Sequence, residues 1–462
     1  MSKITIGQLA DIIGAGAGGS QGLIIDASNV CIDSRKITEG QIFFAIEGKN
    51  FDGHDFIDTA FNAGASCAVV GEGTDKPANK PLLKVKDTTK ALGDLARWWR
   101  KEHNFKVVAI TGSAGKTTTR QIIAAGLGQK FKVAQSPKSF NNNIGVPLTI
   151  LAAEYDCDMI VAELGSSGHG EISNLSRIAI PDIALITNIY PAHLEGLGSI
   201  EGVIKEKASI RDGLKENGKL LVNADFGDLI NHLLNDGRAF ETFGSDVDCD
   251  IKAHNIRTEG AQGWLEIEGI EVKIPFAGRA NLENTLAGWA VCKQFGVSPS
   301  EFAAAVANLK TEDMRLEIVS LGEMTVINDC YNANPASMQN ALDCLEKISS
   351  ETGKRSVFIC GQMNELGDES EKLHAELGEK IAQSGVKLLL TTGDWANIAA
   401  AAAKGIANKD IAVHTFENPA ELCNKLAEFV AHDDIILVKG SRDAKLETVT
   451  AKLEQICLRF CD

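Results

Sequence analysis

The stretch that decides the fold is VVAITGSAGKTTTRQIIAAGL, residues 107–127. An apolar run enters a Gly-Ser-Ala-Gly turn, and a lysine, three threonines and a helical pattern follow. A strand, a glycine turn and a helix form a cradle for phosphate, because backbone N–H groups converge on the phosphate oxygens and the helix N-terminus adds positive potential. The stretch therefore predicts a P-loop that binds the phosphates of a nucleotide.

The side chains of this loop have distinct expected roles. Lys116 would reach the β- and γ-phosphates, and the Thr117 hydroxyl would contact Mg²⁺. A standard P-loop has a glycine six residues before the lysine, where this chain has Ile110, so an ordinary strand–helix corner is the alternative interpretation. The residues expected at the nucleotide are Gly112, Ser113, Ala114, Gly115, Lys116, Thr117 and Thr118.

The overall composition excludes several classes of protein. At 462 residues the chain is too long for one ordinary core, so two or three domains are expected. The net charge of −16 disfavours nucleic-acid binding, and eleven cysteines without a CxxC pair argue against a zinc cage or a disulfide framework. The apolar runs are strand-sized, well below the ~20 residues of a membrane span, and no secretory signal is evident, so a cytoplasmic enzyme is expected.

Alternating strand and helix patterns predict three α/β units. Residues 1–82 form a small unit, and residues 83–313 form a mainly parallel sheet with crossover helices and an antiparallel hairpin at GWLEIEGIEVKIPF, residues 263–276. Residues 314–462 repeat the alternation in a third unit with its own parallel sheet. The three domains are therefore expected to meet near residues 82 and 313.

Two further motifs are rejected as nucleotide sites. GAGAGG, residues 14–19, matches G-x-G-x-x-G, but a helical pattern precedes it and a strand pattern follows, which is the reverse of a dinucleotide site. A glycine loop is the better interpretation. NKDI, residues 408–411, lacks the aspartate of a guanine-reading N-K-x-D motif and lies in the wrong domain, so a GTPase is disfavoured.

Six segments along the chain resemble the Mur ligases of peptidoglycan synthesis, and the resemblance covers essentially the whole sequence. The string YNANP is the most specific, and the DNPR-type string of the member that adds a diamino acid or lysine is absent. The segments are SFNNNIGVPLTIL (139–151), AELGSSGHGEI (162–172), TNIYPAHLEGLGS (187–199), DCYNANPASM (329–338), GQMNELGDES (361–370) and LVKGSR (437–442).

The resemblance implies a three-domain ligase: a UDP-substrate domain, a central P-loop ATPase domain and a Rossmann-like C-terminal domain. It implies that ATP, with Mg²⁺ at two sites, drives addition of D-alanyl-D-alanine to UDP-N-acetylmuramoyl-tripeptide through an acyl phosphate. A monomer with small-molecule substrates is expected. Two alternatives stay open: another Mur-type or folylpolyglutamate-type ligase, and a non-enzymatic P-loop regulator. The third residue of the peptide, diaminopimelate or lysine, is not predicted.

The resemblance also assigns the metal ligands. Glu163 ends the strand pattern MIVAE at the edge where α/β sites lie, and it resembles a Mg²⁺ ligand of the family. His193 matches the ligand of a second magnesium. Lys207 aligns with the lysine that the family carries as a carbamate, and Lys205 is the alternative register. Each could instead be an ordinary solvated or structural side chain.

Further residues match the nucleotide site of the family. Asn281 and Asn284 are one helical turn apart and share a face, with an N-cap role for Asn281 as the alternative. The family histidine before Asn281 is Ala280 here, and an alanine side chain cannot form the hydrogen bonds of a histidine. Arg315 resembles the arginine that meets the γ-phosphate when the domains close, and a salt bridge within the linker is the alternative for it. Asp329 resembles a ribose or hinge contact.

The resemblance extends to the two other substrates. The expected D-alanyl-D-alanine contacts lie in the turn before a helix that Pro335 can start and after the last strand of the chain. They are Asn332, Asn334, Ser337, Lys439, Ser441 and Arg442.

The UDP-substrate contacts are expected in the first domain and in an asparagine-rich loop, which is otherwise typical of plain turns. They are Ser34, Arg35, Gly48, Asp52, Gly53, His54, Asn141, Asn142 and Asn143.

Overall fold

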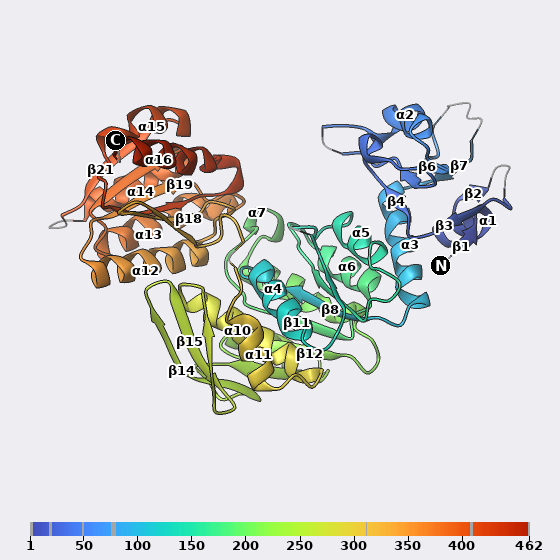
Figure 1. The fold of residues 1–462 in the computed structure, drawn as a ribbon, viewed down its shortest axis with the longest axis horizontal. Helices are drawn as coiled ribbons and strands as arrows, with labels where there is room; N and C mark the ends of the chain where they lie inside the picture. Colours follow the sequence, from blue (N-terminus) through green and yellow to red (C-terminus); the bar gives the residue numbers. More distant parts are fainter. Residues whose placement is uncertain are drawn as a thin grey trace.

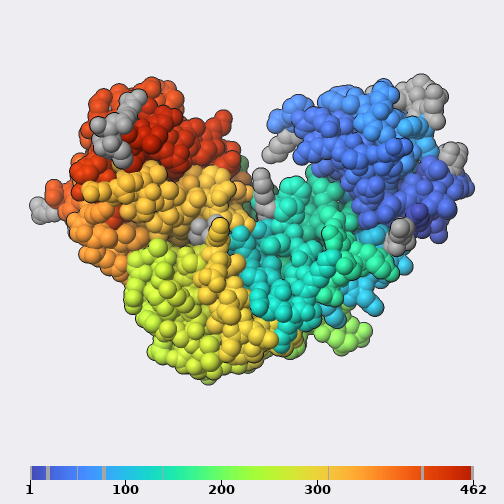
Figure 2. All heavy atoms as spheres, in the orientation of Figure 1, coloured from blue at the N-terminus to red at the C-terminus, as the bar shows by residue number. Residues whose placement is uncertain are grey.

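The computed structural model describes residues 3–17, 21–48, 50–74, 80–137, 139–310, 312–406 and 410–460. Three α/β domains follow one another along the chain, as the sequence predicts (Figure 1). The central domain lies between the other two, and Figure 2 shows a broad hollow between the N-terminal and C-terminal domains. Of the two rejected motifs, residues 18–19 and 408–409 lie outside the described residues.

The N-terminal domain contains a five-stranded sheet with the order β2-β7-β6-β5-β4, and β1 and β3 form a separate antiparallel pair. The expected boundary after residue 82 falls at the start of β7, which pairs with β6 in this sheet. The elements are β1 (Lys3–Thr5), α1 (Ile6–Ile13), β2 (Gly16–Ala17), β3 (Ile24–Asp26), β4 (Val30–Cys31), β5 (Ile42–Phe44), α2 (Ile57–Asn62), β6 (Cys67–Gly71) and β7 (Leu82–Val85).

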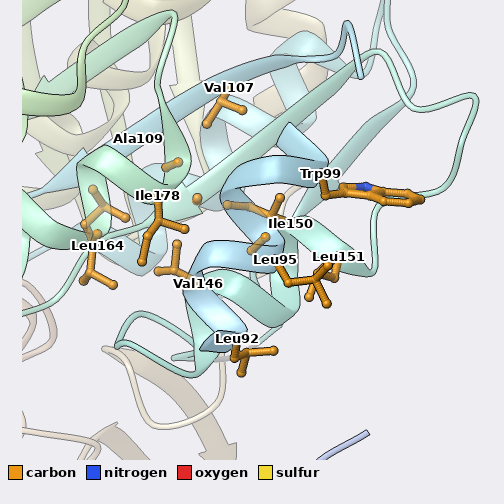
Figure 3. Packing of buried hydrophobic residues seen from close by; sticks show 14 of the residues in the cluster. Leu92, Leu95, Trp99, Val107, Ala109, Val146, Ile150, Leu151, Leu164 and Ile178 are labelled. Carbon is orange, nitrogen blue, oxygen red and sulfur yellow. The ribbon is translucent and has the colours of Figure 1, made fainter. Parts of the chain in front are cut away.

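Helix α3 (Thr88–Glu102) joins this domain to the central one. The Asp87 side chain caps it by accepting from the Lys90 N–H. Figure 3 shows Leu92, Leu95 and Trp99 of α3 beside apolar residues of the central domain. One buried cluster thus runs from the first sheet into one face of the central sheet, so the two domains share a core.

The central sheet has nine strands in the order β16-β15-β14-β13-β12-β11-β8-β10-β9. Strands β8 to β14 pair in parallel, and β14, β15 and β16 pair antiparallel, as predicted for residues 263–276. The strands are β8 (Lys106–Thr111), β9 (Val133–Gln135), β10 (Met159–Glu163), β11 (Ile183–Ile186), β12 (Lys219–Asn223), β13 (Glu241–Gly244), β14 (Ile251–Glu259), β15 (Gln262–Ile267) and β16 (Ile270–Ile274).

Strand β8 lies between β10 and β11, and chain order reverses there. In doubly wound sheets ligands bind at the carboxyl ends of strands at such a point. The strand order therefore indicates a ligand site at the loop that follows β8. The helices of this domain are α4 (Lys116–Leu127), α5 (Gly145–Leu151), α6 (Glu171–Ala179), α7 (Leu194–Leu197), α8 (Ile200–Ala208), α9 (Gly227–Leu234), α10 (Arg279–Gln294) and α11 (Pro299–Val306).

The C-terminal domain has a six-stranded sheet with the order β17-β18-β22-β19-β20-β21, parallel except for β17. Buried clusters lie on both faces. The elements are β17 (Glu317–Leu321), β18 (Met324–Asp329), α12 (Pro335–Thr352), β19 (Ser356–Gly361), α13 (Ser370–Gln383), β20 (Leu388–Thr392), α14 (Asp394–Gly405), β21 (Ala412–Phe416), α15 (Pro419–Lys425), β22 (Ile435–Lys439) and α16 (Glu447–Phe460).

No helix among the described residues is long and apolar enough to cross a membrane.

Candidate active site

The loop after β8 has a conformation that requires its glycines. Gly115 caps α4 with φ +78°, a region that L-residues rarely adopt. A Cβ at Gly115 would lie 2.1 Å from Asn284 Oδ1, and a Cβ at Gly112 would lie 2.0 Å from Thr187 Oγ1. Asn188 fixes the loop from the other side, since its Oδ1 accepts from the Ala114 N–H at 2.8 Å. The conformation of the loop is thus fixed by close packing at both glycines and by the hydrogen bond from Ala114 to Asn188.

Lys116 lies at the start of α4 and is turned back onto its own loop. Its Nζ donates to the Gly112 carbonyl at 2.7 Å. Burial lowers the pKa of Lys116 to about 8, and nearby Arg315 acts in the same direction while Glu163 opposes it. A phosphate group would offer this ammonium a stronger, charged acceptor than the carbonyl.

Glu163 ends β10 beside the P-loop and is fully buried. Its Oε2 accepts from Thr117 Oγ1 at 3.2 Å, and its Oε1 lies 3.3 Å from Arg120 Nη1 without forming a hydrogen bond. Burial raises the pKa of Glu163, with Arg120 and Lys116 opposing the shift. Nothing in the sequence pattern singles out Arg120, because its position in α4 resembles that of a solvated arginine.

The residues here fit a magnesium ion that is shared with phosphate. Within the described part of the chain, no three or more His, Cys, Asp or Glu side chains form a group that could hold a metal. Mg²⁺ needs no such cage, because it keeps several waters and binds one or two carboxylates plus substrate phosphates. The incompletely satisfied Glu163 carboxylate and the Thr117 hydroxyl supply oxygen donors of this kind.

Lys207 is 1% exposed, whereas Lys205 is exposed, so α8 turns only Lys207 toward the interior. Lys207 Nζ donates to Ser166 Oγ at 2.7 Å. Burial lowers the pKa of Lys207 to about 7, and the nearby Lys116 charge adds to this effect. A substantial fraction of the Lys207 amine, which lies behind the loop that follows β10, is therefore neutral near pH 7.

His193 precedes α7 in the left-handed region, with φ +54°. Its Nδ1 is hydrogen-bonded to Glu365 Oε2 of the C-terminal domain. Glu365 lies in GQMNELGDES, a segment used above only for its resemblance, and a glutamate in a turn has no pattern that predicts this contact.

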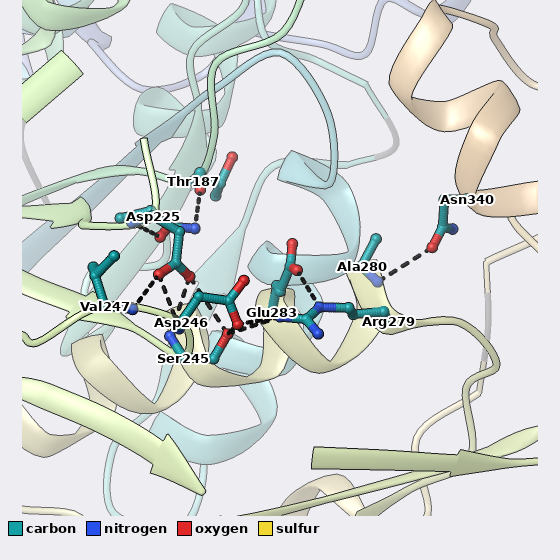
Figure 4. Close-up of polar contacts among 10 residues, drawn as sticks. Thr187, Asp225, Ser245, Asp246, Val247, Arg279, Ala280, Glu283 and Asn340 are labelled. Carbon is teal, nitrogen blue, oxygen red and sulfur yellow. Dashed lines mark hydrogen bonds and ion pairs between the residues drawn. The ribbon is translucent and has the colours of Figure 1, made fainter. Parts of the chain in front are cut away.

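Helix α10 places a polar face beside the P-loop. Asn281 Nδ2 donates to the Ala277 carbonyl at 2.7 Å. Asn284 lies on the same face, and its Nδ2 donates to Asn281 Oδ1 at 3.4 Å. The N-cap alternative for Asn281 is wrong, because the helix begins at Arg279 and its cap is Gly278. Figure 4 shows the Ala280 N–H directed at Asn340 Oδ1, a 3.2 Å hydrogen bond from α10 to α12.

The C-terminal domain contributes the opposite side of the site. Arg315 lies over the Tyr331 ring at 4.1 Å, and Tyr331 Oη donates to Ser139 Oγ of the central domain at 2.6 Å. The buried Lys439 Nζ is paired with the largely buried carboxylate of Asp329 at 2.6 Å. Burial raises the pKa of Asp329, and Lys439 lowers it. Both carboxylate oxygens of Asp329 thus accept hydrogen bonds from the protein, from Lys439 Nζ and from the Leu316 N–H.

One cavity of about 620 Å³ collects most of the predicted residues from the central and C-terminal domains. Unpredicted neighbours such as Tyr190, Arg279, Glu283 and Asn340 line it as well. The predicted residues at this cavity are Ser113, Ala114, Gly115, Lys116, Thr117, Thr118, Asn141, Asn142, Glu163, His193, Asn281, Asn284, Arg315, Asp329, Asn332, Asn334, Ser337 and Lys439.

Five other predicted residues of these two domains are not part of the cavity lining. Gly112 is packed beneath the loop, Asn143 is exposed, and Lys207 lies behind Ser166. Ser441 Oγ accepts from the Asn364 N–H at 2.8 Å, and Arg442 lies near the Tyr331 ring.

The predicted UDP-substrate residues of the first domain lie apart from this cavity. Gly48 and His54 line a second cavity of about 500 Å³, where His54 Nε2 accepts from the Gly71 N–H at 2.9 Å. Asp52 Oδ1 contacts His54 Nδ1 at 2.6 Å. The other three, Ser34, Arg35 and Gly53, lie in short 3₁₀ turns.

Comparison with known proteins identifies the family across the chain. Family models described as "Mur ligase family, catalytic domain", "Mur ligase middle domain" and "Mur ligase, glutamate ligase domain" match residues 26–100, 110–292 and 314–442. The UDP-N-acetylmuramoyl-tripeptide–D-alanyl-D-alanine ligase of Escherichia coli (strain K12) is 36% identical over 464 residues, covering 98% of this chain and 99% of the relative.

Solved structures agree with this similarity. A crystal structure of MurF from Acinetobacter baumannii has a TM-score of 0.88 at 27% identity, covering 98% of this chain and 99% of that chain. MurF ligase from Thermotoga maritima in complex with ADP has a TM-score of 0.83 at 28% identity, covering 94% and 99%. With three matching models in chain order and a relative of similar length, the chain belongs to the Mur ligase family.

Proposed function

We propose that the chain is an ATP-dependent ligase that joins D-alanyl-D-alanine to UDP-N-acetylmuramoyl-tripeptide and yields the UDP-linked pentapeptide for peptidoglycan synthesis. The observation that carries the proposal is the shared cavity, which combines a P-loop with residues of the C-terminal domain. Full-length similarity to ligases of this name supports the choice of substrates. We assign the enzyme to the cytoplasm and expect a monomer.

The reaction requires a carboxylate to attack a phosphorylated nucleotide. The tripeptide carboxylate attacks the γ-phosphorus of ATP, ADP leaves, and an acyl phosphate forms. The amine of D-alanyl-D-alanine then attacks the acyl carbon, loses a proton and expels phosphate. Phosphorylation supplies the leaving group that a free carboxylate lacks. Since two anions must meet, catalysis depends on positioning and on stabilisation of negative charge.

The P-loop and Lys116 are proposed to hold the terminal phosphates. The backbone N–H groups of Gly115, Lys116 and Thr117 at the N-terminus of α4 provide fixed positive potential. Lys116 Nζ would exchange the Gly112 carbonyl for a phosphate oxygen. Arg315, which lies over Tyr331 on the facing domain, is proposed to contact the γ-phosphate.

Mg²⁺ is proposed at two sites, and when bound it would neutralise phosphate charge during transfer. Thr117 and Glu163 would hold one ion, and His193 with a carbamate on Lys207 would hold the other. The carbamate is consistent with the burial of Lys207, because a carbamate forms from a neutral amine and carries the negative charge that a metal ligand needs. The Asn281–Asn284 face is proposed to contact the adenosine part.

The remaining predicted residues are proposed to bind the other substrates. The turn of Asn332, Asn334 and Ser337, together with Lys439, Ser441 and Arg442, would bind the dipeptide. The first domain and the loop at residues 141–143 would bind the UDP-linked tripeptide. Since these groups belong to three domains, domain movement is expected to complete the site.

A coupled phosphate-release assay tests the proposal. Release should require ATP, D-alanyl-D-alanine and a UDP-tripeptide, and running diaminopimelate- and lysine-containing tripeptides in parallel determines the third residue. Release with glutamate or a single diamino acid in place of the dipeptide would instead favour another Mur-type or folylpolyglutamate-type ligase. Nucleotide binding without any amine-dependent release would favour a non-enzymatic regulator.

A further inference from the structure

Two non-glycine residues in strained backbone conformations meet across the interface between the central and C-terminal domains. His193 follows β11 with φ +54°, and Glu365 follows β19 with φ +62°. The left-handed region is uncommon for non-glycine residues, although less so for histidine than for glutamate, and such conformations persist where the surrounding structure imposes them. The coincidence of two outliers at one contact points to a role for the contact itself.

Backbone contacts hold the two loops together independently of the side chains. The Glu195 N–H donates to the Glu365 carbonyl at 3.1 Å. Gly367, with φ +56°, packs so closely that a Cβ there would lie 3.3 Å from Glu195 Cα. Figure 1 shows α7, which follows His193, beside the C-terminal domain. The Glu365 carboxylate is therefore brought to His193 by docking of the two domains.

The side-chain contact has a defined chemical consequence. Glu365 Oε2 is hydrogen-bonded to His193 Nδ1. An ionised carboxylate only accepts hydrogen bonds, so Nδ1 carries a proton, and in the neutral ring Nε2 then keeps its lone pair. His193 lines the cavity, whereas Glu365 is not among the lining residues. Such carboxylate–histidine pairs fix the ring and its tautomer at metal sites.

We propose that Glu365 is a positioning residue that holds His193 in the Nδ1-protonated tautomer, so that docking of the C-terminal domain prepares Nε2 as a ligand in the cavity. The ligand role of Nε2 rests on the proposed function, while the tautomer does not. The chain thus places the carboxylate that orients a central-domain ligand on a different domain.

The first experiment measures the tautomer in the full-length protein. Histidine ¹⁵N spectra at about pH 8, where an ordinary imidazole is neutral, distinguish protonated from unprotonated ring nitrogens. Loss of one signal pair in His193→Gln assigns the residue. The wild type should show protonated Nδ1, and Glu365→Ala should move the population toward protonated Nε2. Glu365→Gln should keep the wild-type tautomer, because its amide oxygen still accepts from Nδ1.

The matched control is Glu195→Gln, which removes an exposed carboxylate from the same interface while leaving its backbone contact in place. It should leave the His193 signals unchanged. An unaltered tautomer in Glu365→Ala would overturn the proposal, and so would an equal change in the control.

The second experiment measures Mn²⁺ affinity by electron paramagnetic resonance in the presence of a non-hydrolysable ATP analogue. Glu365→Ala should weaken binding about tenfold, and Glu365→Gln and Glu195→Gln should bind nearly as the wild type does. If His193→Gln binds Mn²⁺ normally, the metal role of His193 in the proposed function fails. If His193→Gln binds weakly and Glu365→Ala binds normally, only the positioning role of Glu365 fails.

Discussion

Lys207 Nζ donates to the hydroxyl of Ser166 at 2.7 Å, with 1% of the lysine exposed. A neutral hydroxyl is a weak partner for a buried ammonium, and burial lowers the pKa of Lys207 to about 7 from its ordinary 10.5. Below pH 7 the lysine is protonated and cannot react with CO₂; above it the neutral amine dominates.

A carbamate on Lys207 should therefore form increasingly as pH rises from about 6 to 8. Protein equilibrated with ¹³C-bicarbonate should show a carbamate carbon signal that follows this pH dependence and disappears in Lys207→Arg. Lys205→Arg, which alters the exposed neighbour, should keep the signal. A pH-independent signal, or one that survives in Lys207→Arg, would contradict the assignment.

Lys116→Ala should reduce kcat/KM for ATP by about 10²–10³-fold, the range for loss of one charge-stabilising donor. The reason is that no other P-loop side chain supplies a cation to the terminal phosphate. Steady-state phosphate release measures the change, and the thermal midpoint should stay close to that of the wild type because the Lys116 ammonium donates to a carbonyl of its own loop. Normal turnover would remove Lys116 from the mechanism.

Gly115→Ala should abolish measurable ADP affinity, since the new Cβ would lie 2.1 Å from Asn284 Oδ1 and the backbone has φ +78°. Isothermal titration with ADP measures the loss. Gly296→Ala is the matched control, because that residue has φ +73° but no atom lies within 4 Å of the place that its new Cβ would occupy. It should keep ADP affinity and lose only about 1–2 kcal/mol of stability.

Lys439→Met should destabilise the C-terminal domain by about 1–3 kcal/mol, because it leaves the largely buried Asp329 carboxylate, which lines the cavity, without the ammonium that lies 2.6 Å away. Calorimetry should show a lower transition temperature for this domain. The double variant Asp329→Asn/Lys439→Met should recover part of the loss. A double variant less stable than Lys439→Met alone would show that the pair is not the cause.

Helix α12 should control the orientation of the C-terminal domain. Lys347 Nζ donates to Thr258 Oγ1 at 2.7 Å, and Glu351 Oε2 accepts from the Gly260 N–H at 2.8 Å, both across the interface to the β14–β15 hairpin. Lys347→Ala/Glu351→Ala should broaden the distance distribution between spin labels on these two domains, measured by pulsed electron resonance. Gln339→Ala, on the same helix, should leave it narrow.

The sequence predicts strands β8 to β12 of the central sheet and the P-loop well, because apolar runs and a glycine–lysine–threonine turn are local signals. In the central and C-terminal domains it misses β13, β14, β17 and β21. These strands are partly polar and partly exposed, so their apolar pattern is weak. The antiparallel edge strand β17 depends on pairing with β18, which no local pattern encodes.

The same limit applies to the site. The glycines and the lysine of the P-loop are recognisable from a local motif. Arg120, Glu365 and Asn340 belong to no such motif and resemble surface residues in the sequence. The roles of Glu365 and Asn340 arise only when the central and C-terminal domains come together, and that of Arg120 arises only when α4 packs beside β10. The resemblance locates ligand candidates such as His193, but it does not show that a residue 172 positions away would contact its ring.

The hydrogen bond from the Ala280 N–H to Asn340 joins two domains that both line the cavity. An inhibitor confined to the P-loop would contact only the central domain. Substitutions that confer resistance to it would have to lie in that loop or in the residues that pack against it. The affinity of a compound that contacts both α10 and α12 would also depend on substitutions that change the orientation of the C-terminal domain relative to the central domain. Drug resistance to such a compound could then appear in the β14–β15 hairpin, at positions that never touch the drug.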